Sequence, residues 1–212
     1  MSEKQNPKRI LIVAAHPDDE ILGAGATMAK HSAQGDVVHV VICATGAASR
    51  YTGGQSANDK VSFEIDELKD CANKAAKALG TKPPVFLDFP DNQLDSITLL
   101  ELIHKLEPIV NEVNPHIVYT HNGGDLNVDH EMVHRATVTS TRPLPGSNIE
   151  AIYTFETLSS TEWTSAQQQF PFVPNRFEDV TKHFDKKMAA LKCYASEMRP
   201  FPHPRSYEAI EA

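Results

Sequence analysis

A histidine and three carboxylic acids follow directly on an apolar run near the start of the chain. Residues 10–15 are all apolar, and they are followed by His16, Pro17, Asp18, Asp19 and Glu20. Imidazole nitrogen and carboxylate oxygen suit zinc, and a catalytic zinc keeps three protein ligands and one open position. The sequence therefore predicts a metal site to which His16 and Asp19 contribute two ligands from one loop.

The same acids have a second interpretation, in which they only start a helix. Acidic side chains cap helix N-termini and interact favourably with the helix dipole, and Asp18, Asp19 and Glu20 precede a helical pattern. Capping needs one or two acids and no histidine, so we favour the metal site.

His130 is the most suggestive third ligand among the ten histidines. It follows Asn127 and Asp129, just beyond the loop that comes after an expected strand at 116–120. The carboxyl ends of parallel strands share one edge of a sheet, and ligands bind in the crevice outside that edge. Without the motif around His16, we would interpret His130 as an ordinary residue in the first turn of a helix capped by Asp129. The motif around His16 is therefore the reason for assigning His130 as a metal ligand.

A competing zinc motif overlaps this position. His130, Glu131 and His134 match the His-Glu-x-x-His pattern of zinc peptidases, in which two histidines bind metal and the glutamate acts as base. The metzincin glycine and third histidine do not follow. Glu150 and Glu156 could supply a third ligand, although both fall in or beside an expected strand. A zinc peptidase is thus one function that the sequence allows.

Gly23 and Gly25 partly imitate a dinucleotide-binding fingerprint. The third glycine is missing, and three acids precede the pair where a pyrophosphate would bind. We expect these glycines to let the first helix pack closely on the sheet. A non-catalytic sugar- or nucleotide-binding Rossmann domain is the remaining alternative, and it predicts no metal.

Apolar runs and amphipathic stretches alternate along the chain, which predicts an α/β fold with a mostly parallel sheet and helices on both faces. Gly35 and Gly80 stand where left-handed helix ends are needed, and Pro115 ends a helix at Asn114. The expected strands are 9–15, 37–44, 84–88, 116–120, 150–155 and 177–180, and the expected helices are 20–34, 59–79, 97–113, 129–141 and 182–196.

The bulk composition limits the classes of protein. A chain of 212 residues is long enough for one domain, which we place at 1–212, with a loop-rich C-terminal third at 156–212 that completes the substrate pocket. The formal charge of -8 argues against nucleic acid as partner. Three widely spaced cysteines indicate free thiols, and the first residues show no signal peptide or transmembrane segment. We expect a cytoplasmic protein, and a homo-oligomer is compatible with the sequence.

At these residues the chain resembles the PIG-L/LmbE-like zinc-dependent N-deacetylases. The resemblance rests on two motifs, supported by residues 45–50 and 89–92, and reaches to about residue 155. Residues 158–163 and 199–204 look like the bacterial sugar-deacetylase branch. The two motifs are Ala15-His16-Pro17-Asp18-Asp19-Glu20 and Asn127-Val128-Asp129-His130.

The resemblance implies a Rossmann-like three-layer α/β/α fold and removal of acetyl groups from N-acetylated amino sugars of the N-acetylglucosamine type, nucleotide-linked or lipid-linked forms included. It implies zinc, or another divalent transition metal, on His16, Asp19 and His130, with Asp18 as general base. It also implies substrate contacts for Arg50, Asp91, Asn92 and Asn127. Glu20 and Asp129 are expected to support the metal ligands.

One departure from the family is plain. Many relatives carry a histidine three residues before the last ligand, whereas this chain has Asn127, which can donate a hydrogen bond but cannot hold a proton for transfer. We hypothesise that His203 protonates the leaving amine instead. Arg50, Arg199 and Arg205 could also contact a phosphate group on the substrate, because arginine suits phosphate.

Overall fold

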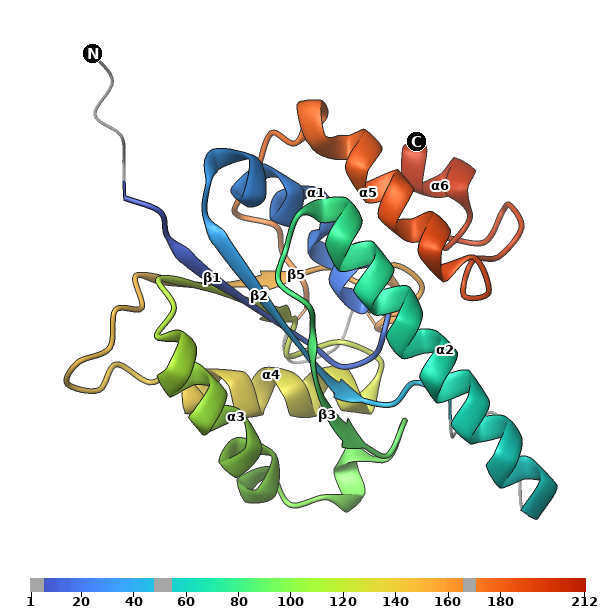
Figure 1. The fold of residues 1–212 in the computed structure, drawn as a ribbon, viewed down its shortest axis with the longest axis horizontal. Helices are drawn as coiled ribbons and strands as arrows, with labels where there is room; N and C mark the ends of the chain where they lie inside the picture. The colour runs from blue at the N-terminus through green and yellow to red at the C-terminus, as the bar shows by residue number, and fades with distance from the viewer. Residues whose placement is uncertain (1–5, 48–54, 166–170) are drawn as a thin grey trace.

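The centre of the computed structural model is a five-stranded parallel sheet (Figure 1). The structure describes residues 6–47, 55–165 and 171–212, with only the backbone of 55–58. The strand order is β3-β2-β1-β4-β5, and every neighbouring pair is parallel, which confirms the α/β prediction. The strands are β1 (Arg9–Ala14), β2 (Val37–Ala44), β3 (Val85–Phe89), β4 (Ile117–His121) and β5 (Ala151–Phe155).

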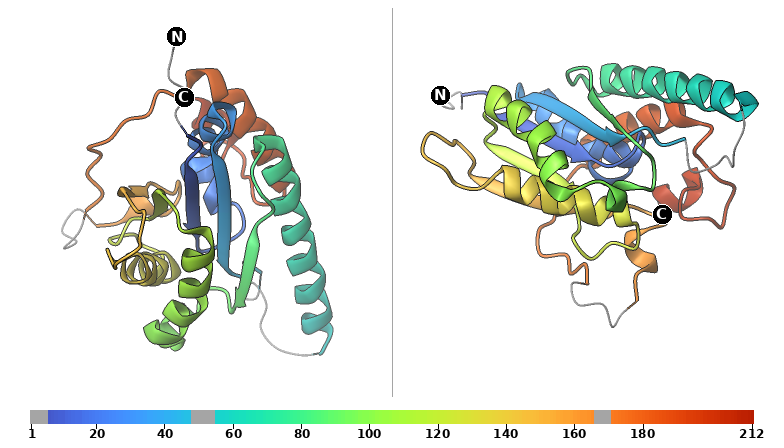
Figure 2. Two further views of the ribbon diagram at one scale, coloured as in Figure 1. Left: turned by 60° about the vertical axis from the view of Figure 1, so that its left-hand side comes forward. Right: turned by 90° about the horizontal axis from the view of Figure 1, so that it is seen from below.

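Helices cover both faces of this sheet, so the fold has three layers (Figure 2, left). On one face lie α1 (Asp19–Gln34), α2 (Gln55–Leu79) and α5 (Phe184–Leu191). On the other face lie α3 (Leu99–Val113) and α4 (Val128–Ser140). The short elements are η2 (Leu94–Ser96), η3 (Thr161–Trp163), η4 (Thr181–His183), η5 (Lys192–Tyr194) and α6 (Tyr207–Glu211).

The central strand β1 belongs to both cores. Successive side chains of a strand point to opposite faces. Ile10 and Ile12 therefore join the core under α1, α2 and α5, whereas Leu11 and Val13 join the core under α3 and α4. The chain leaves β1 toward β2 on one side, while β4 pairs with β1 on the other side. The loop after β1 thus lies where the strand order reverses, which is where open α/β sheets bind ligands.

Several helices end at the glycine and asparagine residues where the sequence predicted their ends. Gly35 and Gly80 have positive φ angles of 90° and 78°, and Asn114 ends α3 in the left-handed region at φ 43° before Pro115. The Thr98 hydroxyl accepts a hydrogen bond from the Glu101 N–H and caps the start of α3.

The prediction fails in two places near the C-terminus. Residues 177–180 are not a strand, because residues 171–180 form no regular element and Phe177 is 82% exposed. Side chains hold this segment instead, with Glu178 accepting a hydrogen bond from Lys30 on α1. The helix expected at 182–196 is broken into η4, α5 and η5.

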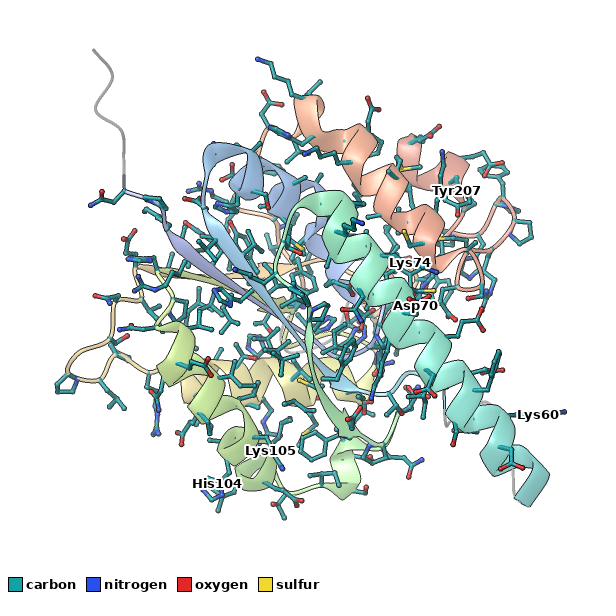
Figure 3. All side chains as sticks on the ribbon, viewed as in Figure 1. Lys60, Asp70, Lys74, His104, Lys105 and Tyr207 are labelled. Carbon is teal, nitrogen blue, oxygen red and sulfur yellow. The ribbon has the colours of Figure 1, made fainter. Side chains whose placement is uncertain are left out.

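Charged and polar residues lie on the exposed sides of α2 and α3. Figure 3 shows Asp70 and Lys74 side by side on α2, where they form an ion pair of 2.6 Å, and His104 and Lys105 on the exposed side of α3. The cysteines, as predicted, are free thiols. None of the helices in the described part of the chain is long and apolar enough to span a membrane.

Gly23 on α1 lies directly against the side chain of Phe155 on β5. A Cβ atom at this position would lie 2.2 Å from Cδ2 of Phe155 on β5, which confirms the packing role expected for this glycine. Gly25 differs, since a Cβ atom at this position would have Lys187 of α5 as its nearest neighbour outside the helix, at 3.4 Å.

Replacing Gly23 with alanine should therefore destabilise the protein. Overpacking a core costs about 1–3 kcal/mol, and we expect a loss in this range in urea denaturation. The exposed Gln34 on the same helix provides the control, because Gln34→Ala should change the unfolding free energy by less than about 0.5 kcal/mol. Equal stability of Gly23→Ala and the wild type would contradict the close contact with Phe155.

Candidate metal centre

The junction between β1 and α1 buries three consecutive acids. Asp18, Asp19 and Glu20 are 4%, 1% and 2% exposed. Asp18 stands at the N-cap of α1, but its side chain makes no capping hydrogen bond, and its φ angle is 103°. A non-glycine residue at such an angle costs of order 1–3 kcal/mol and recurs at functional sites. Helix capping therefore does not account for the Asp18 carboxylate.

His16, Asp19 and His130 come together at the carboxyl edge of the sheet. Asp19 Oδ2 lies 3.1 Å from His16 Nδ1 and 3.1 Å from His130 Nε2, and the three potential ligand atoms are all within 4.8 Å of one another. The second oxygen, Asp19 Oδ1, is buried without a hydrogen-bond partner. A buried carboxylate oxygen without a donor is costly, and a metal cation between these side chains would satisfy it.

The ring nitrogens that face away from this cluster have carboxylate neighbours. His16 Nε2 lies 2.9 Å from Asp129 Oδ2, and His130 Nδ1 lies 3.0 Å from Asp125 Oδ1. Histidines that ligate a metal usually donate their other N–H to a carboxylate, which fixes the tautomer and the orientation of the ring. Both histidines therefore have the surroundings of metal ligands.

A second group of possible ligands shares His16. His16 Nε2 lies 3.4 Å from Asp91 Oδ1, and Asp129 completes this group. Asp129, however, accepts hydrogen bonds from the backbone N–H groups of Asn92 and Leu94 at 2.7 and 2.9 Å. Because its oxygens already have donors, the group around Asp19 fits a cation better.

Burial and charge shift the pKa values of this cluster. Burial alone would raise the pKa of Asp19, but His130 and His16 hold it well below its usual range. Burial alone would lower the pKa of His16, but hydrogen bonds to Asp129 and Asp19 raise it to about 10. His16 is therefore protonated at neutral pH when no metal is bound, and a metal ion must displace that proton.

Asp18 and Glu20 show the opposite behaviour to Asp19. Burial raises the pKa of Asp18 to about 7, although the Arg205 guanidinium lowers it in part. Burial also raises the pKa of Glu20 to about 8, against the effect of the hydrogen bond that the Tyr194 hydroxyl donates to it. Glu20 Oε2 accepts the Asp18 N–H at 3.0 Å, so this side chain stabilises the turn at Asp18.

A polar cavity of 130 Å³ opens beside the cluster. It brings together six residues singled out from the sequence, Arg205 among them, and adds Glu197 from the C-terminal segment. The lining consists of His16, Pro17, Asp18, Gly46, Asp91, Asn92, Asn127, Glu197 and Arg205. Arg50, expected to contact the substrate, is outside the described residues.

Asn127 and His203 occupy different surroundings. Asn127 caps α4 through its Oδ1, which accepts the Asp129 N–H at 2.8 Å, and its Nδ2 donates to Asn92. His203 does not line the cavity. Its ring lies against Trp163 with centroids 5.7 Å apart, and its Nδ1 accepts the Arg205 N–H at 3.0 Å.

The sequence did not identify His121 and Asp125 as neighbours of the site. The His121 ring stacks on His130 with centroids 3.9 Å apart, and its Nε2 accepts the Ala15 N–H at 2.9 Å. That bond occupies the nitrogen, so His121 supports the cluster. Its position at the end of β4 is the signal that could have found it. Asp125 accepts hydrogen bonds from Ser160 and Thr161.

The peptidase pattern on α4 does not assemble. His134 Nδ1 donates to the His121 carbonyl oxygen at 2.9 Å, and its ring packs against Gly123. Among the described residues, neither Glu131 nor His134 belongs to a group of possible metal ligands. His130 therefore pairs with His16 and Asp19 rather than with the histidine one turn further along its own helix.

Comparison with known proteins identifies the family of this chain. Residues 11–141 match the family model described as PIG-L, GlcNAc-PI de-N-acetylase. The chain belongs to the PIG-L family. It is 32% identical over 202 residues to YaiS of Escherichia coli, described as an uncharacterized deacetylase, covering 92% of this chain and 95% of that protein. The identity to the 1D-myo-inositol 2-acetamido-2-deoxy-alpha-D-glucopyranoside deacetylase of Mycolicibacterium smegmatis is 27%, covering 98% and 86% of the two chains.

Two solved structures show how widely this PIG-L fold is used. GalB of Pseudomonas putida KT2440, a 4-carboxy-2-hydroxymuconate hydratase, superposes with a TM-score of 0.71 at 27% identity, covering 90% of this chain and 80% of that chain. The N,N'-diacetylchitobiose deacetylase of Pyrococcus horikoshii superposes with a TM-score of 0.67 at 21% identity, covering 98% and 78% of the two chains. The fold therefore does not by itself fix the reaction.

Proposed function

We propose that this protein is a zinc-dependent hydrolase that removes the acetyl group from an N-acetylated amino sugar. The observation that carries the proposal is the buried group of His16, Asp19 and His130, which lies beside Asp18 at a polar cavity. Two imidazoles and one carboxylate are a ligand set of catalytic zinc, and other divalent transition metals accept the same donors. PIG-L relatives named as deacetylases of acetamido sugars support the substrate class.

Each residue of the site has a proposed task. A zinc ion on His16, Asp19 and His130 would supply a Lewis acid and lower the pKa of a water molecule. The Asp18 carboxylate accepts the proton of the attacking water and returns it to the leaving amine. The Asn127 amide, with a second Nδ2 hydrogen besides the one donated to Asn92, stabilises the developing oxyanion.

The cavity also suggests how a sugar is held. Asp91 and Asn92 line it from the β3 side, and their carboxylate and amide groups suit sugar hydroxyls. Arg50 as a further substrate contact remains a prediction, and so does His203 as the alternative to Asp18 for protonating the leaving amine. We propose one domain over 1–212, with the C-terminal third contributing Glu197 and Arg205 to the pocket.

The proposal is tested by measuring acetate release from free, nucleotide-linked and lipid-linked N-acetylglucosamine derivatives. We expect acetate and a free amine from at least one compound, and no cleavage of unmodified peptides. Elemental analysis of the purified protein separates a hydrolase from a non-catalytic binding domain, which predicts no metal. A protein that hydrates unsaturated acids but releases no acetate would share the reaction of GalB instead, and the proposal would be wrong.

Glu131 distinguishes the deacetylase from the peptidase. In a peptidase of the His-Glu-x-x-His type Glu131 is the base, so Glu131→Gln would abolish activity. In our assignment Glu131 has no part in the reaction, and we expect Glu131→Gln to release acetate at nearly the wild-type rate. Loss of acetate release by a folded, zinc-loaded Glu131→Gln variant would contradict the assignment of Asp18.

A further inference from the structure

The C-terminal segment reaches back to the loop that carries the proposed base. Arg205 Nη1 donates to Asp18 Oδ2 at 2.9 Å, although the two residues are 187 positions apart in sequence. Their side chains are only 22% and 5% exposed. The family match ends at residue 141, so this contact comes from a part of the chain beyond it. In Figure 1 that segment, drawn in orange and red, packs on the side of α1 and α2.

The Arg205 guanidinium is held in place by other groups as well as by Asp18. Its Nε donates to Ser159 Oγ at 2.7 Å and to the Leu158 carbonyl oxygen at 3.4 Å. Its backbone N–H donates to His203 Nδ1 at 3.0 Å. Arginine is a planar fork of donors, so fixing Nε also fixes the direction in which Nη1 points.

Asp18 needs such a partner because its own helix does not hold its side chain. The carboxylate makes no capping bond to α1, and the backbone is in the left-handed region at φ 103°. The Arg205 contact occupies Oδ2, so the task of accepting a proton falls to Oδ1. A base fixed through one oxygen presents the other in a constant direction, which proton transfer requires.

We propose that Arg205 is a positioning residue that orients the Asp18 carboxylate for proton transfer. The inference rests on the proposed function in naming Asp18 as the base. It also changes the role that the sequence suggested for Arg205, which was contact with a phosphate. Donors already committed to Asp18 and Ser159 are poorly available to a phosphate on the substrate.

The test compares Arg205→Ala with the wild type, both loaded with zinc, on the N-acetylglucosamine derivative that the wild type cleaves fastest. A misplaced catalytic group can cost about 10²-fold, and we expect a kcat loss of this order with little change in KM. Guanidinium ion added to Arg205→Ala should restore part of kcat. Arg205→Lys should retain more kcat than Arg205→Ala, because an ammonium group can replace one contact of the fork.

Arg199 provides the matched control. It lies in the same C-terminal loop, is exposed and does not line the cavity. In the described contacts its guanidinium donates only to the Ser196 and Met198 carbonyl oxygens, and its backbone N–H, which the substitution keeps, donates to the Arg205 carbonyl oxygen. Arg199→Ala should keep the wild-type kcat. In an Asp18→Asn background, Arg205→Ala should cause little further loss, because the two changes remove one interaction.

Crystal structures give a readout that does not depend on turnover. We expect the Asp18 carboxylate to be displaced in Arg205→Ala while His16 and Asp19 keep their positions. An unmoved Asp18, an unchanged kcat, a loss confined to KM, or loss of zinc would each overturn the inference. If Arg205→Ala does not fold, Arg205→Met, which keeps the side-chain stem, takes its place. Absence of acetate release by the wild type would reject the proposed function, whereas the structures still decide whether Arg205 orients Asp18.

Discussion

Replacing Asp18 with asparagine should lower kcat for acetate release by about 10³-fold while zinc stays bound, because a positioned general base contributes about 10²–10⁴-fold. Asparagine has the shape of aspartate, but its amide cannot accept a proton. Asp18 is not one of the three residues grouped around the metal position, so the ligands remain complete. The measurement is kcat together with the zinc content of the same preparation.

The control for this variant is Glu131→Gln, an acid-to-amide change on α4 that leaves the cavity lining intact. Folding of Asp18→Asn is checked by its circular dichroism and unfolding temperature. Turnover within a few-fold of the wild type would show that another group accepts the proton. Loss of zinc from Asp18→Asn would show that Asp18 helps to bind the metal.

Replacing His130 with alanine should remove both the metal and the activity. His130 is 1% exposed, and its Nε2 lies 3.1 Å from Asp19 Oδ2, so no other side chain can take its place without rearrangement. A ligand at about 1,000 times its Kd stabilises a protein by about 4 kcal/mol, so zinc should raise the unfolding temperature of the metal-free wild type. His130→Ala should show no such rise.

His134→Ala is the matched control, one turn further along α4. Its ring donates to the His121 carbonyl oxygen and does not belong to the ligand group, so this variant should bind zinc and release acetate. Calorimetric titration with zinc checks both variants. Zinc binding by His130→Ala with the affinity of the wild type would place the metal elsewhere, for example at His16, Asp91 and Asp129.

Local patterns were sufficient to predict most of the fold and the grouping of His16, Asp19 and His130 at one edge of the sheet. The apolar run of β1 and the helix ends at Gly35 and Asn114 are properties of short segments, and the structure reproduces them. His16 and Asp19 are three residues apart where the loop after β1 enters α1, so their proximity follows from the chain itself. His130 could be joined to them because β1 and β4 are parallel and end at the same edge of the sheet.

The groups that the sequence did not place depend on distant parts of the chain. Arg205 reaches Asp18 through the course of the C-terminal segment, and Tyr194 reaches Glu20 in the same way. Hydrophobic periodicity predicts helices and strands, and it does not predict which distant side chains will contact one another. The error at 177–180 has a related cause, since Phe177 and Val180 favour a strand but this segment has no strand pairing in the structure.

The most direct test of the proposed reaction is to measure acetate release against zinc content in one series. Metal-free protein is titrated with zinc, and acetate and free amine are quantified from the best N-acetylglucosamine derivative. The proposed hydrolysis predicts equal amounts of acetate and amine, with a rate that rises until one zinc is bound per chain. Acetate release independent of zinc, or a zinc-loaded protein that releases no acetate from any of these derivatives, would contradict it.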